Sequence, residues 1–427
     1  MGSATAFLIL TLSSLLGALS SVSSPTPQQQ CSPAPLPFPS TNGTCSPFMI
    51  DDKTPQSIIS TSPWTSPPYC ITPRSIQSTQ KFCIYTSTSY NLGTGISILT
   101  TPEVATILAA SISDPLPPFE ARSHLAHNGT LSPSQLSPLP YEVLPLEGKG
   151  FGVIATKPIA KFDIIMTAFP DAIVDNAFLP AETEEAPVES WRALSKMLLG
   201  LEGADGRRFT SMATSNARGD VHFVEDVVRT NAFGLFVGGR DMKGVYPEVA
   251  RLNHACDANS FPQYIGRDLG MRVVATRDIK PGEEITISYI PHGMPSVYRQ
   301  RNLANWSFKC TCNLCTASPS TLAASDARRH KLADLYTQME ASSTSLPQLK
   351  ALIEEFEAIV DKEGLEVKRG EYYQGFMMFH HARGDWKGAL KYAEASLQRT
   401  ETFSDPDGGY AGGLRNDIQF LKDLIKA

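Results

Sequence analysis

Three cysteines stand within six residues in the last third of the chain, at Cys310, Cys312 and Cys315. A disulfide between two of them would leave the third thiol unpaired, and a bridge also needs a narrow Cα separation. Zinc in structural sites takes four tetrahedral ligands, commonly cysteine thiolates. Four other cysteines lie far away, between residues 31 and 83, so the fourth ligand expected is Cys256. We predict a four-cysteine zinc site, with free thiols or a redox cluster as the alternatives.

Three further motifs accompany these cysteines. Residues 147–153 (Glu-Gly-Lys-Gly-Phe-Gly-Val) carry alternating glycines, which let the backbone turn sharply or approach a ligand closely. Residues 253–259 (Asn-His-Ala-Cys-Asp-Ala-Asn) include Cys256 itself. Residues 281–289 open with a Pro-Gly turn and continue as an alternating strand that ends at Tyr289. Taken singly, each motif has a plain interpretation: a turn, a loop histidine, an ordinary strand tyrosine.

In this order the motifs resemble a SET-domain protein methyltransferase, over about residues 142–316. The resemblance implies an α+β fold of small curled sheets with a helical insertion, in which the Asn-His strand and the segment leading to Tyr289 thread together. The layout is similar to fungal SET-containing proteins and, distantly, to SET–MYND proteins. No cysteine lies between Cys83 and Cys256, which excludes an inserted MYND finger. Ala255 and Ala258 replace the serine and proline frequent in the family.

The resemblance also implies a reaction, the transfer of a methyl group from S-adenosylmethionine to the ε-amine of a lysine in a protein or peptide. Tyr289 matches the tyrosine that positions the amine and the methyl group, and is the catalytic residue expected. The positions that match the family's cofactor contacts are Lys149, Gly150, Phe151, Asn231, Asn253, His254 and Phe308. The four cysteines match the zinc ligands of a post-SET segment.

The first 24 residues have the composition of a secretory signal peptide. An apolar run from Ala6 to Leu19 leads to small residues ending at Ser24, and no charged side chain precedes Asp51. The run turns serine-rich before it reaches the roughly 20 apolar residues of a spanning helix, so no stable membrane span is expected. An uncleaved leader or an anchor is the alternative.

Residues 25–141 form a region rich in proline, serine and threonine that holds 19 of the chain's 32 prolines. Short strands are expected at 82–85 and 96–99, a helix from residue 102, and a loop over 116–140. Its cysteines are Cys31, Cys45, Cys70 and Cys83. Behind a signal peptide they favour two disulfides, in any of three connectivities, over free thiols. Glycosylation sequons begin at Asn42, Asn128 and, further on, Asn305.

The remaining chain divides into a SET domain over 142–291, a zinc segment over 292–324 and a helical domain over 325–427. Residues 155–159 are echoed by residues 275–279, each a strand running into a turn. Helical spacing occurs within 186–201 and again in the tail, where Asp385 is expected to cap a helix of a tetratricopeptide-like unit. This tail either covers one side of a substrate groove or only stabilises the protein.

Three functions fit these features: a SET-type lysine methyltransferase, a non-catalytic SET-fold binding protein of the secretory pathway, and a secreted module whose N-terminal cysteine region is active. A net charge of −6 argues against direct nucleic-acid binding. The leader predicts the secretory pathway or the extracellular space, whereas S-adenosylmethionine and its lysine substrates are mainly intracellular. A nuclear or cytoplasmic location is therefore the alternative if the leader is not used.

Overall fold

The computed structural model describes residues 62–71, 81–113, 139–179, 188–201, 209, 211–214 and 223–426. All of them belong to one compact unit that begins at Asp52. The predicted leader, Cys31, Cys45, the sequons at Asn42 and Asn128 and most of the predicted loop 116–140 lie outside the described residues.

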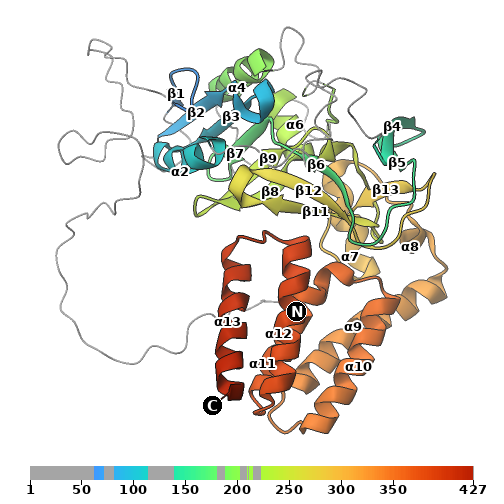
Figure 1. Cartoon of the computed structure of the whole chain (residues 1–427). Helices are drawn as coiled ribbons and strands as arrows, with labels where there is room; N and C mark the ends of the chain where they lie inside the picture. Colours follow the sequence, from blue (N-terminus) through green and yellow to red (C-terminus); the bar gives the residue numbers. More distant parts are fainter. Residues whose placement is uncertain are drawn as a thin grey trace, which may run out of the picture. The chain divides into compact units, whose positions relative to one another are not determined.

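A six-stranded sheet joins the N-terminal region to the predicted SET region (Figure 1), in the order β1-β2-β3-β7-β9-β8. The central neighbours β3 and β7 run parallel, and a disulfide between Cys70 and Cys83 links β1 to β2. The strands are β1 (Tyr69–Ile71), β2 (Phe82–Ser87), β3 (Ile96–Thr100), β7 (Ala172–Asp175), β8 (Phe233–Val237) and β9 (Arg240–Val245). The strands expected at 82–85 and 96–99 are therefore confirmed.

Alternating side chains of this sheet enter two hydrophobic cores, as expected for strands covered on both faces. On one face Ile84 and Leu99 pack with Trp191, which is fully buried. On the other face Tyr85 and Ile98 pack against helix α2. The helices of this region are α1 (Tyr90–Gly93), α2 (Pro102–Ser113), α4 (Val188–Leu201) and α6 (Phe223–Asn231). Helix α4 confirms the helical spacing seen within 186–201, and α2 the helix expected from residue 102.

Two smaller sheets complete the SET region, with strand orders β10-β13-β5-β4 and β11-β12-β6. Their strands are β4 (Tyr141–Leu146), β5 (Gly150–Ala155), β6 (Ile164–Ala168), β10 (Asn253–His254), β11 (Ser260–Ile265), β12 (Gly270–Ala275) and β13 (Glu284–Ile287). The echoed segments meet each other, because Ile159 and Ile279 exchange both backbone hydrogen bonds. Buried Asn259 ties the loop after β10 to β13, accepting from the Thr286 N–H at 2.8 Å.

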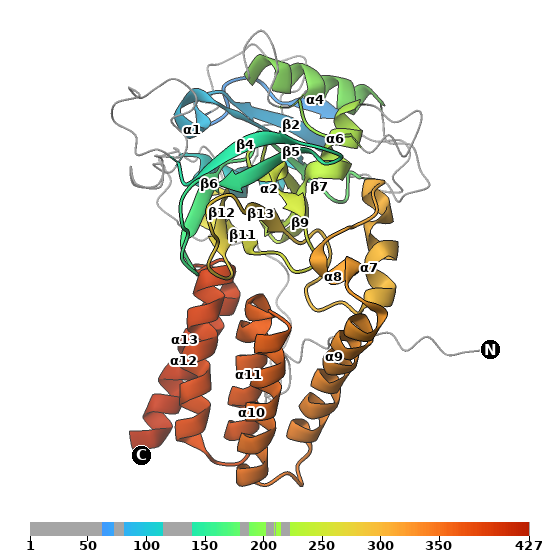
Figure 2. The same ribbon diagram turned by 90° about the vertical axis from the view of Figure 1, so that its right-hand side faces the viewer.

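Helices predominate in the described residues after β13, and α9 to α13 stand side by side (Figure 2). Their bounds are α7 (Ser296–Leu303), α8 (Asn313–Thr316), α9 (Pro319–Glu340), α10 (Leu346–Lys362), α11 (Arg369–His381), α12 (Trp386–Phe403) and α13 (Gly409–Lys426). Short 3-10 turns lie at η3 (Val249–Arg251), η4 (Gly266–Asp268), η5 (Ala304–Trp306) and η6 (Glu366–Lys368). The Asp385 side chain accepts from the Gly388 N–H, which confirms the predicted cap of α12.

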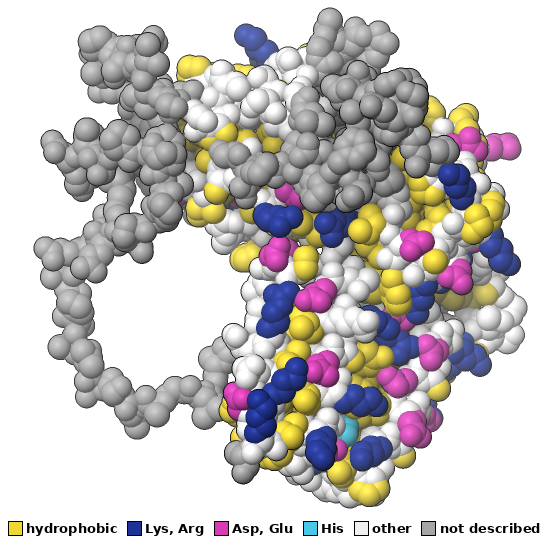
Figure 3. Space-filling view, viewed as in Figure 1, with side chains coloured by type: hydrophobic (Ala, Val, Ile, Leu, Met, Phe, Trp, Pro, Cys, Tyr) yellow, Lys and Arg dark blue, Asp and Glu magenta, His cyan; other side chains and the backbone are white. Residues whose placement is uncertain are grey.

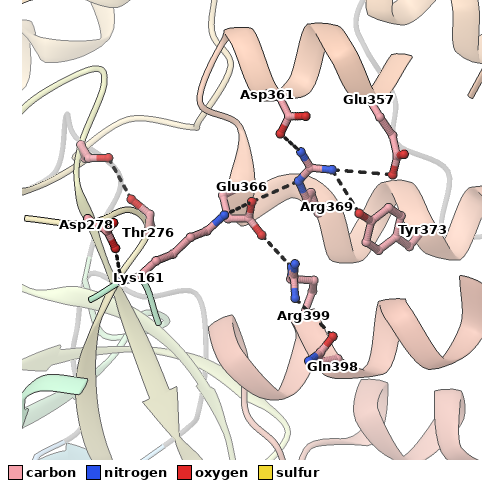
Figure 4. A network of polar contacts seen from close by, with 11 residues as sticks. Lys161, Thr276, Asp278, Glu357, Asp361, Glu366, Arg369, Tyr373, Gln398 and Arg399 are labelled. Carbon is pink, nitrogen blue, oxygen red and sulfur yellow. Dashed lines mark hydrogen bonds and ion pairs between the residues drawn. The ribbon is translucent and has the colours of Figure 1, made fainter. Parts of the chain in front are cut away.

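A buried carboxylate joins the helical tail to the SET region (Figure 4). Glu366 accepts from Lys161 at 2.8 Å, from Arg369 at 3.1 Å and from Arg399 at 2.6 Å. Beside it Phe162 holds a φ of 74°, which is uncommon for an aromatic residue. Its ring lies 6.0 Å from that of Phe403. Charged and apolar contacts therefore act together at this joint.

The surface of the helical tail carries charges of both signs. On the face shown in Figure 3, basic and acidic side chains are interspersed rather than gathered by sign. Among the described helices, none is both long and apolar enough to cross a membrane.

Candidate metal centre and active site

The sulfur atoms of Cys256, Cys310, Cys312 and Cys315 all lie within 4.8 Å of one another. Cys256 follows β10, whereas Cys310 and Cys312 precede the short helix α8 and Cys315 lies within it. Two of the Sγ–Sγ distances are 3.9 Å (Cys256 to Cys310) and 3.5 Å (Cys256 to Cys315). A tetrahedral zinc with bonds of about 2.3 Å places its sulfurs about 3.8 Å apart. The predicted ligands are therefore brought together at distances that suit zinc.

The electrostatics of the cluster also suit a dication. Hydrogen bonds to Cys310 and Cys312 raise the pKa of Cys256, whereas hydrogen bonds received from Cys256 and Cys310 lower the pKa of Cys312. The thiols by themselves thus favour one thiolate that is stabilised by protonated neighbours. A bound Zn²⁺ would deprotonate its ligands and offset their mutual repulsion. These four residues would hold the metal as a structural ion.

His254 connects the cysteine cluster to Tyr289. Its Nδ1 accepts the Tyr289 backbone N–H at 3.0 Å, so the ring proton lies on Nε2. That Nε2 is 3.2 Å from Cys256 Sγ, to which it donates. Burial lowers the pKa of His254 to about 4, which keeps the ring neutral at neutral pH. The histidine therefore fixes the place of the tyrosine relative to the predicted metal.

Tyr289 lies among aromatic rings just beyond the end of β13. Its centroid is 5.3 Å from that of His254, 5.4 Å from Trp306 and 6.3 Å from Phe308. Its hydroxyl donates to the carbonyl of Leu252 at 2.8 Å. Burial raises the pKa of Tyr289 to about 12, so the phenol stays protonated at neutral pH. The hydroxyl is therefore oriented, neutral and partly desolvated.

Trp306 is a residue of this site that sequence reasoning missed. Besides its contact with Tyr289, its indole N–H donates to the carbonyl of Thr230 at 3.0 Å. This bond joins the turn before the cysteine triplet to the end of α6, next to Asn231. The available signal was its place two residues before Phe308, the aromatic that matches the family motif.

Glu284 organises the strands expected to contact the cofactor. It pairs with Lys149 at 2.6 Å and accepts from the Asn253 amide at 2.9 Å. The same amide nitrogen of Asn253 also donates to the carbonyl of Phe151 at 3.0 Å. The glutamate, the second acidic residue of the Gly-Glu-Glu motif, thus links the glycine turn, β5 and β10, a role that its motif position alone did not reveal.

The glycine turn presents an open backbone. Gly150 has a φ of 70°, and the space where a Cβ would stand is empty to 4 Å. Phe151 remains half exposed, with the Arg251 guanidinium 5.5 Å from its ring centroid. The Phe308 ring is partly exposed as well and lies 6.0 Å from His254. Open backbone and aromatic faces beside the polar Asn253 fit a ligand with a flat ring and polar groups.

Asn231, the remaining predicted contact, is the last residue of α6. Its amide nitrogen donates to the carbonyls of Ala213 at 2.7 Å and Val227 at 2.9 Å. Both amide protons are thus used within the protein, which leaves the side-chain oxygen as its acceptor group. The Thr230–Trp306 contact places this residue close to the aromatic cluster.

Comparison with known proteins supports the interpretation of these motifs as parts of one domain. Residues 150–290 match the family model of the SET domain. The chain contains a SET domain. This SET-domain protein is homologous to SMYD lysine methyltransferases and to fungal SET5 proteins.

The similar proteins match part of the chain rather than its whole length. N-lysine methyltransferase SMYD2-B of Danio rerio is 28% identical over 174 residues, which cover 36% of this chain and 39% of that protein. Histone-lysine N-methyltransferase SMYD3 of Homo sapiens is 41% identical over 73 residues, 17% of each protein. Histone-lysine N-methyltransferase SET5 of Candida albicans is 41% identical over 73 residues, 17% of this chain and 15% of that protein. The chain spans less than half the length of each.

Proposed function

We propose that this SET-domain protein is an S-adenosylmethionine-dependent protein-lysine N-methyltransferase. The observation that carries the proposal is the convergence of Tyr289, His254 and Phe308 beside the cysteine cluster, within a chain that contains a SET domain. The cofactor would be held by Lys149, Gly150, Phe151, Asn231, Asn253, His254 and Phe308. When bound, it supplies an electrophilic methyl group on a sulfonium.

The protein's own residues prepare the amine of the substrate lysine for methyl transfer. A lysine amine is nucleophilic only when neutral, and desolvation favours the neutral form. The aromatic rings of Tyr289, Trp306 and Phe308 provide such an apolar surround. Because the Tyr289 proton is used by the Leu252 carbonyl, its oxygen is left to accept from an amine N–H. Tyr289 therefore orients the amine as a neutral phenol and does not act as a phenolate base.

The test starts with the purified full-length protein. Calorimetric titration with S-adenosylmethionine should show binding, and a mixture of lysine peptides should accept labelled methyl groups. Tyr289→Phe is expected to slow the transfer about tenfold or more with cofactor affinity kept, because the removed hydroxyl stabilises the transition state rather than the bound cofactor. Tyr298→Phe, an exposed tyrosine on α7, is the matched control. Equal rates of methyl transfer in the two variants refute the role of Tyr289. If calorimetry shows no binding of S-adenosylmethionine, the non-catalytic SET-fold binding protein is the function that remains.

We also propose that the protein resides in the secretory pathway or the extracellular space. The leader-like N-terminus and the Cys70–Cys83 disulfide support an oxidising compartment. Zinc would protect the four thiolates there from oxidation. N-terminal sequencing of the mature protein should find a start between Ser21 and Gln28. A start at Met1 or Gly2 rejects the cleaved leader and favours the nucleus or cytoplasm.

A further inference from the structure

The segment 288–295 carries Tyr289 from β13 to α7 and belongs to no helix or strand. Pro291 and Pro295 lack a backbone N–H, and Gly293 has a φ of 85°. Because the segment lacks the regular backbone hydrogen bonds of a helix or a sheet, its conformation depends on hydrogen bonds from groups elsewhere in the fold.

One backbone carbonyl of this segment is held by two buried arginines. Met294 O accepts from Arg299 Nε at 2.9 Å and from Arg329 Nη1 at 3.2 Å. Arg299 lies on α7 and is 1% exposed, whereas Arg329 comes from α9 in the helical tail. The side chain of Met294 packs into the small core that also contains Tyr289, Trp306 and the cysteines. Anchoring this carbonyl therefore anchors the surroundings of the predicted catalytic residue.

Arg329 is itself held in place. Its Nε donates to Glu363 Oε2 at 2.9 Å, and the side chain of Glu363 is 3% exposed. Three residues before Arg329, Asp326 accepts from the Ser296 N–H at 2.9 Å and from the Ser296 hydroxyl at 2.5 Å. Helix α9 therefore fixes both the end of the segment and the first residue of α7.

We propose that Arg329 is a positioning residue for methyl transfer, which acts from the helical tail on Tyr289 through the Met294 carbonyl. The inference rests on the proposed function. Arginine suits this task because its rigid fork reaches two acceptors, Glu363 and Met294, whereas the single ammonium of lysine does not hold both in place. The helical tail is thereby part of the catalytic unit and not only a cover beside it.

The chain supplies a matched control in the neighbouring residue. Arg328 Nε donates to the other oxygen of the same Glu363, at 2.6 Å. Within the described residues, Arg328 makes no hydrogen bond or ion pair to the segment 288–295. Replacing either arginine by glutamine removes one partner of Glu363, but only the change at Arg329 also removes one of the two donors to the Met294 carbonyl.

The experiment compares full-length Arg329→Gln and Arg328→Gln with the wild type. We measure kcat, KM for S-adenosylmethionine, and amide hydrogen exchange of peptides that cover 288–296. Arg329→Gln should lower kcat about tenfold or more with KM changed less than about threefold, because a displaced catalytic group costs rate rather than cofactor affinity. Exchange in the segment should become about tenfold faster or more, since its anchored amides open more often. Arg328→Gln should stay within about twofold in all three.

Equal effects of the two variants, an unchanged kcat in Arg329→Gln, or unchanged exchange in the segment each overturn the inference. If Arg329→Gln does not fold, Arg329→Lys, which keeps the charge beside Glu363, takes its place with the same expectations. Exchange is read without turnover, so the anchor is judged even if the wild type transfers no methyl group. That last result refutes the proposed function alone.

Discussion

Replacing Glu366 by glutamine tests whether the charged joint between the helical tail and the SET region contributes to stability. The change keeps the shape of the side chain but removes the charge that faces Lys161, Arg369 and Arg399. Glu366 is 7% exposed, so the three cations lose a partner that water replaces only in part. We therefore expect a substantial loss of folding free energy.

The size of this loss depends on which partners or water molecules remain for each cation once the Glu366 charge is removed. Removing one partner of a buried ion pair costs about 3–5 kcal/mol. Lys161 is partly exposed and can be hydrated, and Arg369 keeps its contacts to Asp361 and Tyr373. The lower end of that range applies, so Glu366→Gln should lower the free energy of unfolding by about 3 kcal/mol at pH 7.

The assay is urea unfolding followed by tryptophan fluorescence, with Glu371→Gln as the control. Glu371 pairs with Lys368 on the surface and is 59% exposed, so its loss should cost less than about 1 kcal/mol. If Glu366→Gln lowers the free energy of unfolding by less than about 1 kcal/mol, the reasoning is refuted, because the loss would then be no larger than that of an exposed ion pair.

The pH dependence gives a second check on Glu366. Burial alone would raise the pKa of Glu366, but the hydrogen bond from Lys161 and the charges of Arg399 and Arg369 outweigh it and hold the pKa below 4.5. The stabilisation is therefore present above pH 4.5 and is lost as the pH falls through the pKa of the folded state. The difference between wild type and Glu366→Gln should shrink in acid, and a constant difference contradicts this account.

Three further predictions concern the metal, the disulfide and a histidine. Cys312→Ser should abolish binding of one zinc per chain, measured by metal analysis; absence of zinc in the wild type removes the site. The double change Cys70→Ser and Cys83→Ser opens a loop of sequence separation 13 and should cost about 3 kcal/mol of unfolding free energy; an unchanged urea midpoint contradicts this. Burial, together with the charges of Lys368 and Arg329, lowers the pKa of His292 in the folded protein to about 4. Neutral His292 therefore leaves the folding free energy unaffected above the unfolded pKa of about 6.5, and the protein loses stability as the pH falls from about 6.5 towards 4. Between pH 7.5 and pH 5 the free energy of unfolding of His292→Gln should therefore fall by about 2 kcal/mol less than that of the wild type. Parallel curves of unfolding free energy against pH for the two proteins rule out this contribution.

Local patterns predicted the elements well. The cap at Asp385, the apolar spacing of α10 and the strands around Cys83 depend on neighbouring residues, and all were confirmed. The cysteine cluster was predictable for another reason, since three thiols within six residues require a fourth partner for zinc and Cys256 was available.

Apart from the meeting of Cys256 with the cysteine triplet, the long-range pairings could not be predicted from the residues alone. The parallel pairing of β3 with β7 connects segments of ordinary apolar composition, and nothing local distinguishes this partner from others. Trp306 and Glu284 acquire their roles only when the turn before the cysteine triplet and the glycine turn meet β13. Glu366 looks like a surface glutamate until cations from the loop before β6, from α11 and from α12 surround it.

The two kinds of sulfur site differ in when a growing chain can complete them. Cys70 and Cys83 face each other on adjacent strands, so their bond can close as soon as that hairpin has left the ribosome. The metal site needs Cys256 together with Cys315 and stays incomplete until most of the SET region has been synthesised. Translation order thus lets Cys70 and Cys83 pair before Cys256 and the cysteine triplet appear, which reduces the chance of a bridge between these two groups.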